Sequence, residues 1–383
     1  MADNEVSKLT WVAIVVALAF TVYGVVKIKA PDVISGVFNN AHKLTSDNTS
    51  NQSDIPNLLD SKIKSGNISA WNATPESVLA DVSAMKLNAV TVPVLVDIPN
   101  LHSNDATVNA ASLESAKVMI DTLIKKGIRV TVEPYPYVDN GRSGETGLQP
   151  PDELTFMTNW SNAVKAVANA FSDKDVKGLY IGSNFENLED QSQAFLSLIS
   201  DLRKTFDGSI LYRTNWWYTA SWSEDSLKHF ETKKNTPFFK ALDILSVAAY
   251  FEVTKGSDDP NPQADIMDVN QLKAAFKNTF KWNRGQNLVG ELESLENAVG
   301  KPIMFGELGI ANYQYAMSRP YHYGYQATDV KNSAIQAIWY QAWLETMHDY
   351  SWFKGYSIYS IGDSTSEFYP NGDAQKTLSQ LNS

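Results

Sequence analysis

The sequence predicts a (β/α)8 barrel, an α/β fold in which eight parallel strands alternate with helices and close into a ring. From residue 66 onward, short and nearly continuous apolar runs alternate with amphipathic stretches of helical length, a pattern typical of parallel strands covered by helices. The alternative is an open, doubly wound sheet. Such a sheet usually carries a glycine-rich turn after its first strand when it binds nucleotides, and Trp71-Asn72-Ala73-Thr74 contains no glycine. The barrel is therefore the favoured fold.

Apolar runs mark the expected strands, and helical patterns separate them. After the first run, Thr74 provides a helix cap and Pro75 a favourable first turn. Before the last run, residues 332–347 place apolar side chains at helical spacing. In chain order, the expected strands are residues 66–71, 88–96, 128–135, 176–183, 209–216, 242–251, 301–308 and 353–361.

The segment before the barrel is expected to be a membrane anchor. The stretch from Leu9 to Val26 carries no charge, and at about 1.5 Å per residue it is about 27 Å long, just enough to cross a bilayer. Trp11 and Tyr23 lie near its ends, where interfacial aromatic residues are common. A cleavable signal peptide and a buried core helix are the alternatives. Acidic residues before the stretch argue against the first, and the lack of a polar face argues against the second.

The chain is thus divided into three parts. We assign residues 1–30 to a single-pass transmembrane anchor, 31–65 to a linker and 66–383 to the barrel. The linker is rich in Ser, Asn, Asp and Thr, a composition typical of flexible spacers. Lysines flank the apolar stretch on both sides, so the charge rule leaves the orientation open. The activity expected of the barrel places it outside the cytoplasm.

Composition excludes several classes of function. The net charge is −11 and no basic block occurs, which argues against nucleic acid as a partner. Cysteine is absent, which excludes disulfides, thiolate metal sites and a cysteine nucleophile. The five histidines are too far apart in the sequence for an HExxH-type zinc site. We expect neither a metal ion nor a cofactor.

Carboxylate, amide and aromatic residues follow the expected strands, at the end of the barrel where reacting groups project. Glu307 stands out because it lies inside an apolar run, where an unpaired charge is costly. Two carboxylates can cleave a glycosidic bond, one protonating the leaving oxygen while the other attacks the anomeric carbon. Aromatic faces can stack on sugar rings. The residues expected to bind a sugar here are Trp71, Glu133, Asn184, Asn215, Trp216, Trp217, Tyr250 and Tyr359.

The order of these motifs resembles glycoside hydrolase family 113, the β-mannanase-like barrels of the retaining clan with two catalytic glutamates. The resemblance covers nearly all of residues 66–383. It is based on RVTVEPYPYVDNG (129–141), LYIGSNFENLE (179–189), LDILSVAAYF (242–251), KPIMFGELG (301–309) and YPNGDAQKTL (369–378).

The resemblance implies a role for several residues. Glu307 would be the nucleophile, Tyr250 would hydrogen-bond it and Asn215 would line the site. Where the family carries its acid/base glutamate, the ungapped position here holds Asn184. Either Glu186 serves as the acid/base after a local shift, or the acid is lost. Tyr359 is the expected sugar platform in place of the family's tryptophan.

These observations favour a membrane-anchored retaining glycoside hydrolase outside the cytoplasm. Its substrate would be a β-linked hexose polysaccharide, either mannan-like or a glycan of the cell envelope. The alternative is a catalytically impaired barrel that binds glycan as a surface or assembly protein. A further alternative is self-association through the N-terminal helix.

Overall fold

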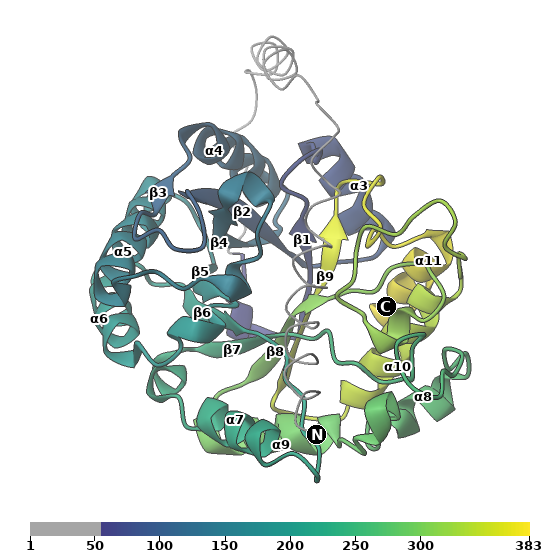
Figure 1. Ribbon diagram of the computed structural model, residues 1–383. Coiled ribbons are helices and arrows are strands. Elements are labelled where there is room, and N and C mark those ends of the chain that lie inside the picture. The colour runs from purple at the N-terminus through teal and green to yellow at the C-terminus, as the bar shows by residue number, and fades with distance from the viewer. Residues whose placement is uncertain (1–54) are drawn as a thin grey trace. The chain divides into compact units, whose positions relative to one another are not determined.

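Residues 55–383, which the computed structural model describes, contain one nine-stranded sheet in the order β1-β9-β8-β7-β6-β5-β4-β2-β3. An additional pairing of β1 with β2 closes this sheet into a barrel (Figure 1). All barrel pairs are parallel, whereas the two-residue β3 pairs antiparallel with β2. The strands are β1 Ile63–Ile68, β2 Ala89–Ile98, β3 Thr107–Val108, β4 Arg129–Val138, β5 Gly178–Ser183, β6 Ser209–Thr214, β7 Ile244–Ala248, β8 Ile303–Leu308 and β9 Phe353–Ile361.

The predicted parallel barrel is confirmed, with one clear shift in position. The first strand runs over Ile63–Ile68 instead of 66–71, because Ile63 is buried and pairs with Gly355 of β9. Trp71 therefore lies in the loop after β1 and is 61% exposed. The compact unit begins at Ile55, so it includes residues 55–65, which the sequence analysis placed in the linker.

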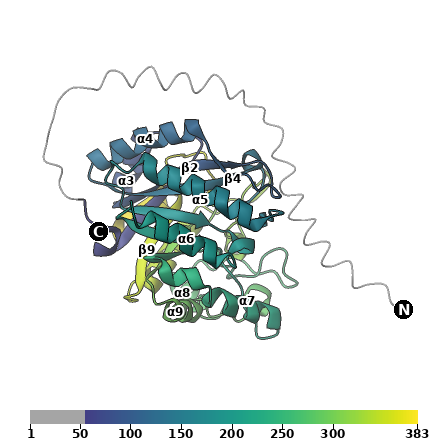
Figure 2. The same cartoon turned by 90° about the vertical axis from the view of Figure 1, so that its left-hand side faces the viewer.

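Helices surround the ring of strands (Figure 1), and α4, α5 and α6 lie one below another on the side shown in Figure 2. The predicted cap of α3 is confirmed, since the Thr74 side chain accepts a hydrogen bond from the amide of Ser77 and Pro75 is the first helical residue. The helices are α3 Pro75–Ala84, α4 Ala110–Lys125, α5 Glu153–Ala170, α6 Ser192–Leu202, α7 Glu224–Lys234, α8 Val269–Ala275, α9 Leu288–Val299, α10 Ile335–Met347 and α11 Gly372–Leu381.

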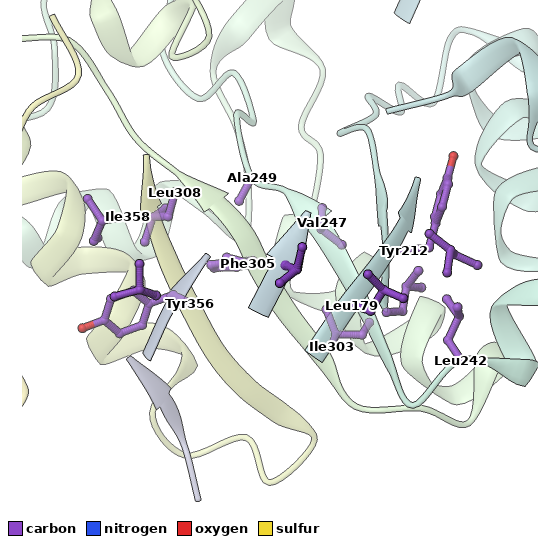
Figure 3. Packing of buried hydrophobic residues seen from close by; sticks show 14 of the residues in the cluster. Leu179, Tyr212, Leu242, Val247, Ala249, Ile303, Phe305, Leu308, Tyr356 and Ile358 are labelled. Carbon is purple, nitrogen blue, oxygen red and sulfur yellow. The ribbon is translucent and has the colours of Figure 1, made fainter. Parts of the chain in front are cut away.

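The core has two main parts, beside a small cluster of Ala248, Tyr250 and Phe368. The larger lies between the strands and the helices, and Figure 3 shows strand residues Leu179, Val247, Phe305 and Ile358 within it. Phe305 meets Trp343 of α10 edge to face, with ring centroids 5.1 Å apart. A smaller apolar cluster contains Leu58, Ile63, Ala89, Tyr180, Leu211, Ile244 and Met304. Most of its members lie at the N-terminal ends of their strands, which leaves the opposite end of the barrel for polar groups.

The expected membrane anchor, Leu9–Val26, lies outside the described residues. Within residues 55–383, no helix has both the length and the apolar character needed to cross a membrane.

Candidate active site

A buried arginine on β6 links two carboxylates inside the barrel. The Arg213 Nη1 donates to Glu133 Oε1 at 2.6 Å and to Glu307 Oε1 at 2.8 Å, and Nη2 donates to Glu133 Oε2 at 3.0 Å. The guanidinium also donates to the Ser183 hydroxyl at 2.9 Å and lies over the ring of Tyr180. Arg213, Glu133 and Glu307 are all buried. Breaking such a buried network costs far more than breaking a surface ion pair, so Glu307 is held in place.

Gly306 makes room for this arginine. A Cβ at position 306 would lie 1.8 Å from Ser246 Oγ and 2.9 Å from Arg213 Nε, so a larger residue would displace both. The register of β8 shifts against β9 between Phe305 and Leu308, an irregularity that re-aims side chains at such positions. The local backbone at Gly306 therefore determines where the next residue, Glu307, points.

The surroundings of Glu307 shift the pKa of its carboxyl group. Burial raises its pKa to about 7, with added repulsion from Glu133 and Glu145, while Arg213 and a hydrogen bond from Tyr250 oppose the shift. The Tyr250 hydroxyl keeps its proton because burial and the charge of Glu307 raise its own pKa. The family resemblance implied a hydrogen bond from Tyr250 to Glu307, and each of the two groups shifts the pKa of the other.

A second carboxylate reaches the site from a loop. Glu145 begins the short 3-10 helix η5 (Glu145–Gly147), which follows β4, and its Oε1 accepts from Asn184 Nδ2 at 2.8 Å. Asn184 is buried just after β5 and adopts a left-handed φ of 54°. Removal from water raises the pKa of Glu145 above its ordinary value, despite the hydrogen bond from Asn184.

Glu186 has different neighbours. It begins the 3-10 helix η6 (Glu186–Leu188), its Oε2 accepts from Asn215 Nδ2 at 3.0 Å, and its Oε1 lies 3.4 Å from His229 Nε2. These three residues line a cavity of about 450 Å³ together with Trp216, Trp217, Tyr218, Asp225 and Ser226. Asn215 therefore binds Glu186 and does not contact Glu307 by any hydrogen bond seen in the described residues.

Aromatic residues line the mouth of the barrel. Exposed Trp71 contacts Tyr137, with ring centroids 5.3 Å apart. Trp216 stacks on Tyr321 and meets Tyr250 edge to face. Tyr359 is half-buried beside Tyr250.

Trp217 differs from its neighbour Trp216 because it is almost fully buried. It is 3% exposed, donates from Nε1 to Glu291 and stacks on Phe230. Trp217 forms part of the wall of the cavity that Glu186 also lines. Glu133 likewise supports the site through Arg213, because both of its oxygens are engaged there.

The sequence analysis missed three residues of this region: Glu145, Arg213 and His229. Arg213 could have been found, because it lies within the apolar run SILYRTNW and the argument that singled out Glu307 applies to it equally. Glu145 and His229 gave no comparable signal, since both lie outside the expected strands. No group of acidic and histidine side chains suited to a metal ion occurs within residues 55–383.

The profile of the family described as Glycoside Hydrolase Family 113 matches residues 102–379. No curated protein sequence matches the chain.

Among solved structures, a GH113 β-1,4-mannanase superposes with a TM-score of 0.65 at 16% identity, over 84% of this chain and 99% of that one. A GH113 β-mannanase from Alicyclobacillus acidocaldarius, in complex with ManMIm, gives 0.64 at 14% identity, over 85% and 98%. A β-glucuronidase from Ruminococcus gnavus gives 0.52 at 8% identity, over 84% of this chain and 49% of that one. At these identities, the likeness is one of fold.

Proposed function

The chain belongs to Glycoside Hydrolase Family 113, as its motifs predicted, and we propose that it hydrolyses a β-linked hexose polysaccharide of mannan type with retention of configuration. The observation that carries this proposal is the buried Glu307, which is fixed by Arg213 and hydrogen-bonded by Tyr250 at the mouth of the barrel. A retaining enzyme needs a fixed carboxylate at that place as its nucleophile.

The aromatic rim supports a polymeric substrate. Trp71 and Trp216 lie on different sides of the site, on the loops after β1 and β6, and each offers a ring face or edge to a sugar unit. The family structures that superpose on the chain are described as β-1,4-mannanases, which makes mannan the first substrate to test.

The test is release of reducing sugar by the full chain from β-1,4-mannan, β-glucans and envelope polysaccharides. We expect the wild-type chain to cleave a β-linked hexose polymer and Glu307→Gln to abolish cleavage. Glu114→Gln, on the exposed face of α4, is the matched control and should leave the rate unchanged. The anomer first formed, followed by NMR, should have the same configuration as the substrate. An inverted anomer, or cleavage that survives Glu307→Gln, would contradict the proposal.

A glycan-binding barrel without activity is the second candidate, since Asn184 occupies the position where the family resemblance implies a glutamate. The same panel separates the two functions. Binding of a polymer by the wild-type chain without any cleavage would favour the binding protein.

The proposal also includes the location of the enzyme. The uncharged stretch Leu9–Val26 would anchor the chain in the membrane and hold the barrel outside the cytoplasm, within reach of a polymer. Fractionation of expressing cells, followed by protease treatment of intact cells or spheroplasts, tests this. The barrel should sediment with membranes and be digested from outside. Cross-linking of the full chain tests whether the N-terminal helix also drives self-association.

A further inference from the structure

A retaining hydrolase needs a second carboxyl group about 5–5.5 Å from its nucleophile to protonate the leaving oxygen. Three glutamates are candidates, namely Glu133 and Glu145, whose charges act on Glu307, and Glu186, which follows β5. Glu133 is excluded because both of its oxygens accept hydrogen bonds from Arg213 deep inside the barrel. A carboxylate engaged in this way has no oxygen free to donate a proton to a substrate.

Glu186 is also poorly placed. It lies after β5 on η6, and its two oxygens face Asn215 and His229 in the cavity beside the site. Both Glu186 oxygens therefore have partners in that cavity. Its side chain is 30% exposed, which keeps it hydrated.

Glu145 is held at the end of β5 by a side-chain contact. Its Oε1 accepts a hydrogen bond from the side chain of Asn184, which directly follows β5. The loop after β4 therefore brings a carboxyl group to the end of β5, where the chain itself carries an amide. The loop is fixed, since Asn187 Nδ2 donates to the carbonyls of Thr146 at 3.1 Å and Leu148 at 3.2 Å. The backbone amide of Asn184 in turn donates to the Arg213 carbonyl at 2.8 Å.

The electrostatics agree with this placement. The charge of Glu145 raises the pKa of Glu307, and the charges of both glutamates raise the pKa of Tyr359. The charge of Glu145 therefore acts on both groups. Burial raises the pKa of Glu145 itself above its ordinary value, which is the direction that a general acid requires. The groups around the pair are Arg213, Glu133, Tyr135, Tyr250 and Tyr359.

We propose that Glu145 is the general acid and base of this enzyme, held by Asn184 as its positioning residue. The inference rests on the proposed function. In the first step, a Glu307 oxygen attacks the anomeric carbon, the bond to the glycosidic oxygen breaks, and Glu145 gives its proton to that oxygen. In the second step, Glu145 takes a proton from water, the water oxygen attacks the anomeric carbon, and Glu307 is released as a carboxylate.

The test compares Glu145→Ala, Glu145→Gln, Glu186→Gln and Glu307→Gln in the full chain on two substrates. One is the polymer that the wild-type chain cleaves. The other is the 2,4-dinitrophenyl glycoside of the same sugar, whose leaving group needs no proton. We expect Glu145→Ala to lose about 10²–10⁴-fold in kcat/KM on the polymer, with a much smaller loss on the aryl glycoside. Azide should restore turnover and give a glycosyl azide of retained configuration.

Three other outcomes would contradict the role of Glu145, and they differ in what they imply for the proposed function. If Glu186→Gln shows this signature and the Glu145 variants do not, the inference is wrong. If Glu307→Gln abolishes cleavage of the polymer while both Glu145 variants cleave it at the wild-type rate, the inference fails and the proposed function stands. If the wild-type chain cleaves neither substrate, both fail. Far-UV circular dichroism and melting of Glu145→Gln, the conservative variant, show whether a loss reflects unfolding.

Discussion

At the scale of single residues, the central fact is that Arg213 serves two carboxylates at once. Both pairs are buried, with N–O distances of 2.6 and 2.8 Å, so the positive charge is shared between Glu133 and Glu307. Glu133 has two of these hydrogen bonds and Glu307 has one. Because Glu307 receives the smaller share, Arg213 lowers the pKa of Glu307 less than burial raises it, and the pKa is about 7.

This arrangement predicts the pH dependence of the reaction. Glu307 must be ionised to attack, and its pKa is about 7, so kcat/KM should fall as the pH drops below about 7. In Glu133→Gln, one repelling charge is gone and Arg213 acts mainly on Glu307, so the pKa of Glu307 should decrease. The acidic limb of the kcat/KM profile should then move to lower pH. Glu114→Gln is the control, and a limb that stays in place or moves upward would contradict this account.

The same shift has a consequence for stability. A carboxyl whose pKa is raised from 4.5 to about 7 holds its proton in the folded state after the unfolded chain has lost it. Between these two pH values the folding free energy becomes less favourable with rising pH, by about 3 kcal/mol in total from this group. The active site is therefore built at the expense of stability.

The sequence predicted the residues of the site unequally. Glu307 could be identified because a charge within an apolar run requires a partner, and the same argument would have found that partner, Arg213. The contact between Glu145 and Asn184 could not be identified, because it depends on how the loop after β4 folds over the end of β5. Spacing along the chain contains no information on such a contact.

At the scale of elements, a buried ion pair outside the Arg213 network holds the loop after β5 against the barrel. Lys233 of α7 donates to Glu189 Oε2 at 3.0 Å and to the Thr214 hydroxyl at 2.6 Å. Glu189 follows η6, and its Oε1 accepts from Thr214 at 2.6 Å and from Tyr212 at 3.3 Å. This network joins α7 to the ends of β5 and β6, where Asn184, Glu186 and Asn215 lie.

We expect Lys233→Met to destabilise the protein by about 3–5 kcal/mol, because it leaves Glu189 buried without its cation. Urea unfolding measures this loss. Lys228→Met, at an exposed position of the same helix, should change stability by less than about 0.5 kcal/mol. A cost for Lys233→Met as small as that of the control would show that the pair does not hold the loop.

The elements themselves were largely predictable. The apolar runs and the cap at Thr74 located the barrel strands and α3 because they reflect local burial and local hydrogen bonding. The first strand was misplaced by three residues, since IKSGNI lacks a continuous apolar run. Its position is determined by pairing with β9, which is far away in the sequence.

At the scale of the whole molecule, the barrel is closed by β1 and filled at one end by the segment before it. Leu58 is 1% exposed and packs with Ile63, Tyr180 and other residues of the smaller apolar cluster. Arg129 of β4 fixes this segment by donating to the carbonyls of Asn57 at 3.3 Å and Lys62 at 3.1 Å. The residues just before β1 are therefore part of the barrel.

This closure predicts that Leu58→Ala destabilises the protein by about 2–5 kcal/mol, as expected when a buried leucine is replaced by alanine and leaves a cavity. The neighbouring Leu59 lies in the same 3-10 turn, η3 (Leu58–Asp60), but is 44% exposed, so Leu59→Ala should cost far less. A chain beginning at residue 66 lacks Leu58 and half of β1, and it should not melt cooperatively, whereas a chain beginning at residue 55 should. Thermal melting of the two leucine variants and the two shortened chains measures these differences in stability. Equal losses for the two leucines, together with cooperative melting of the chain from residue 66, would show that the barrel closes without this segment.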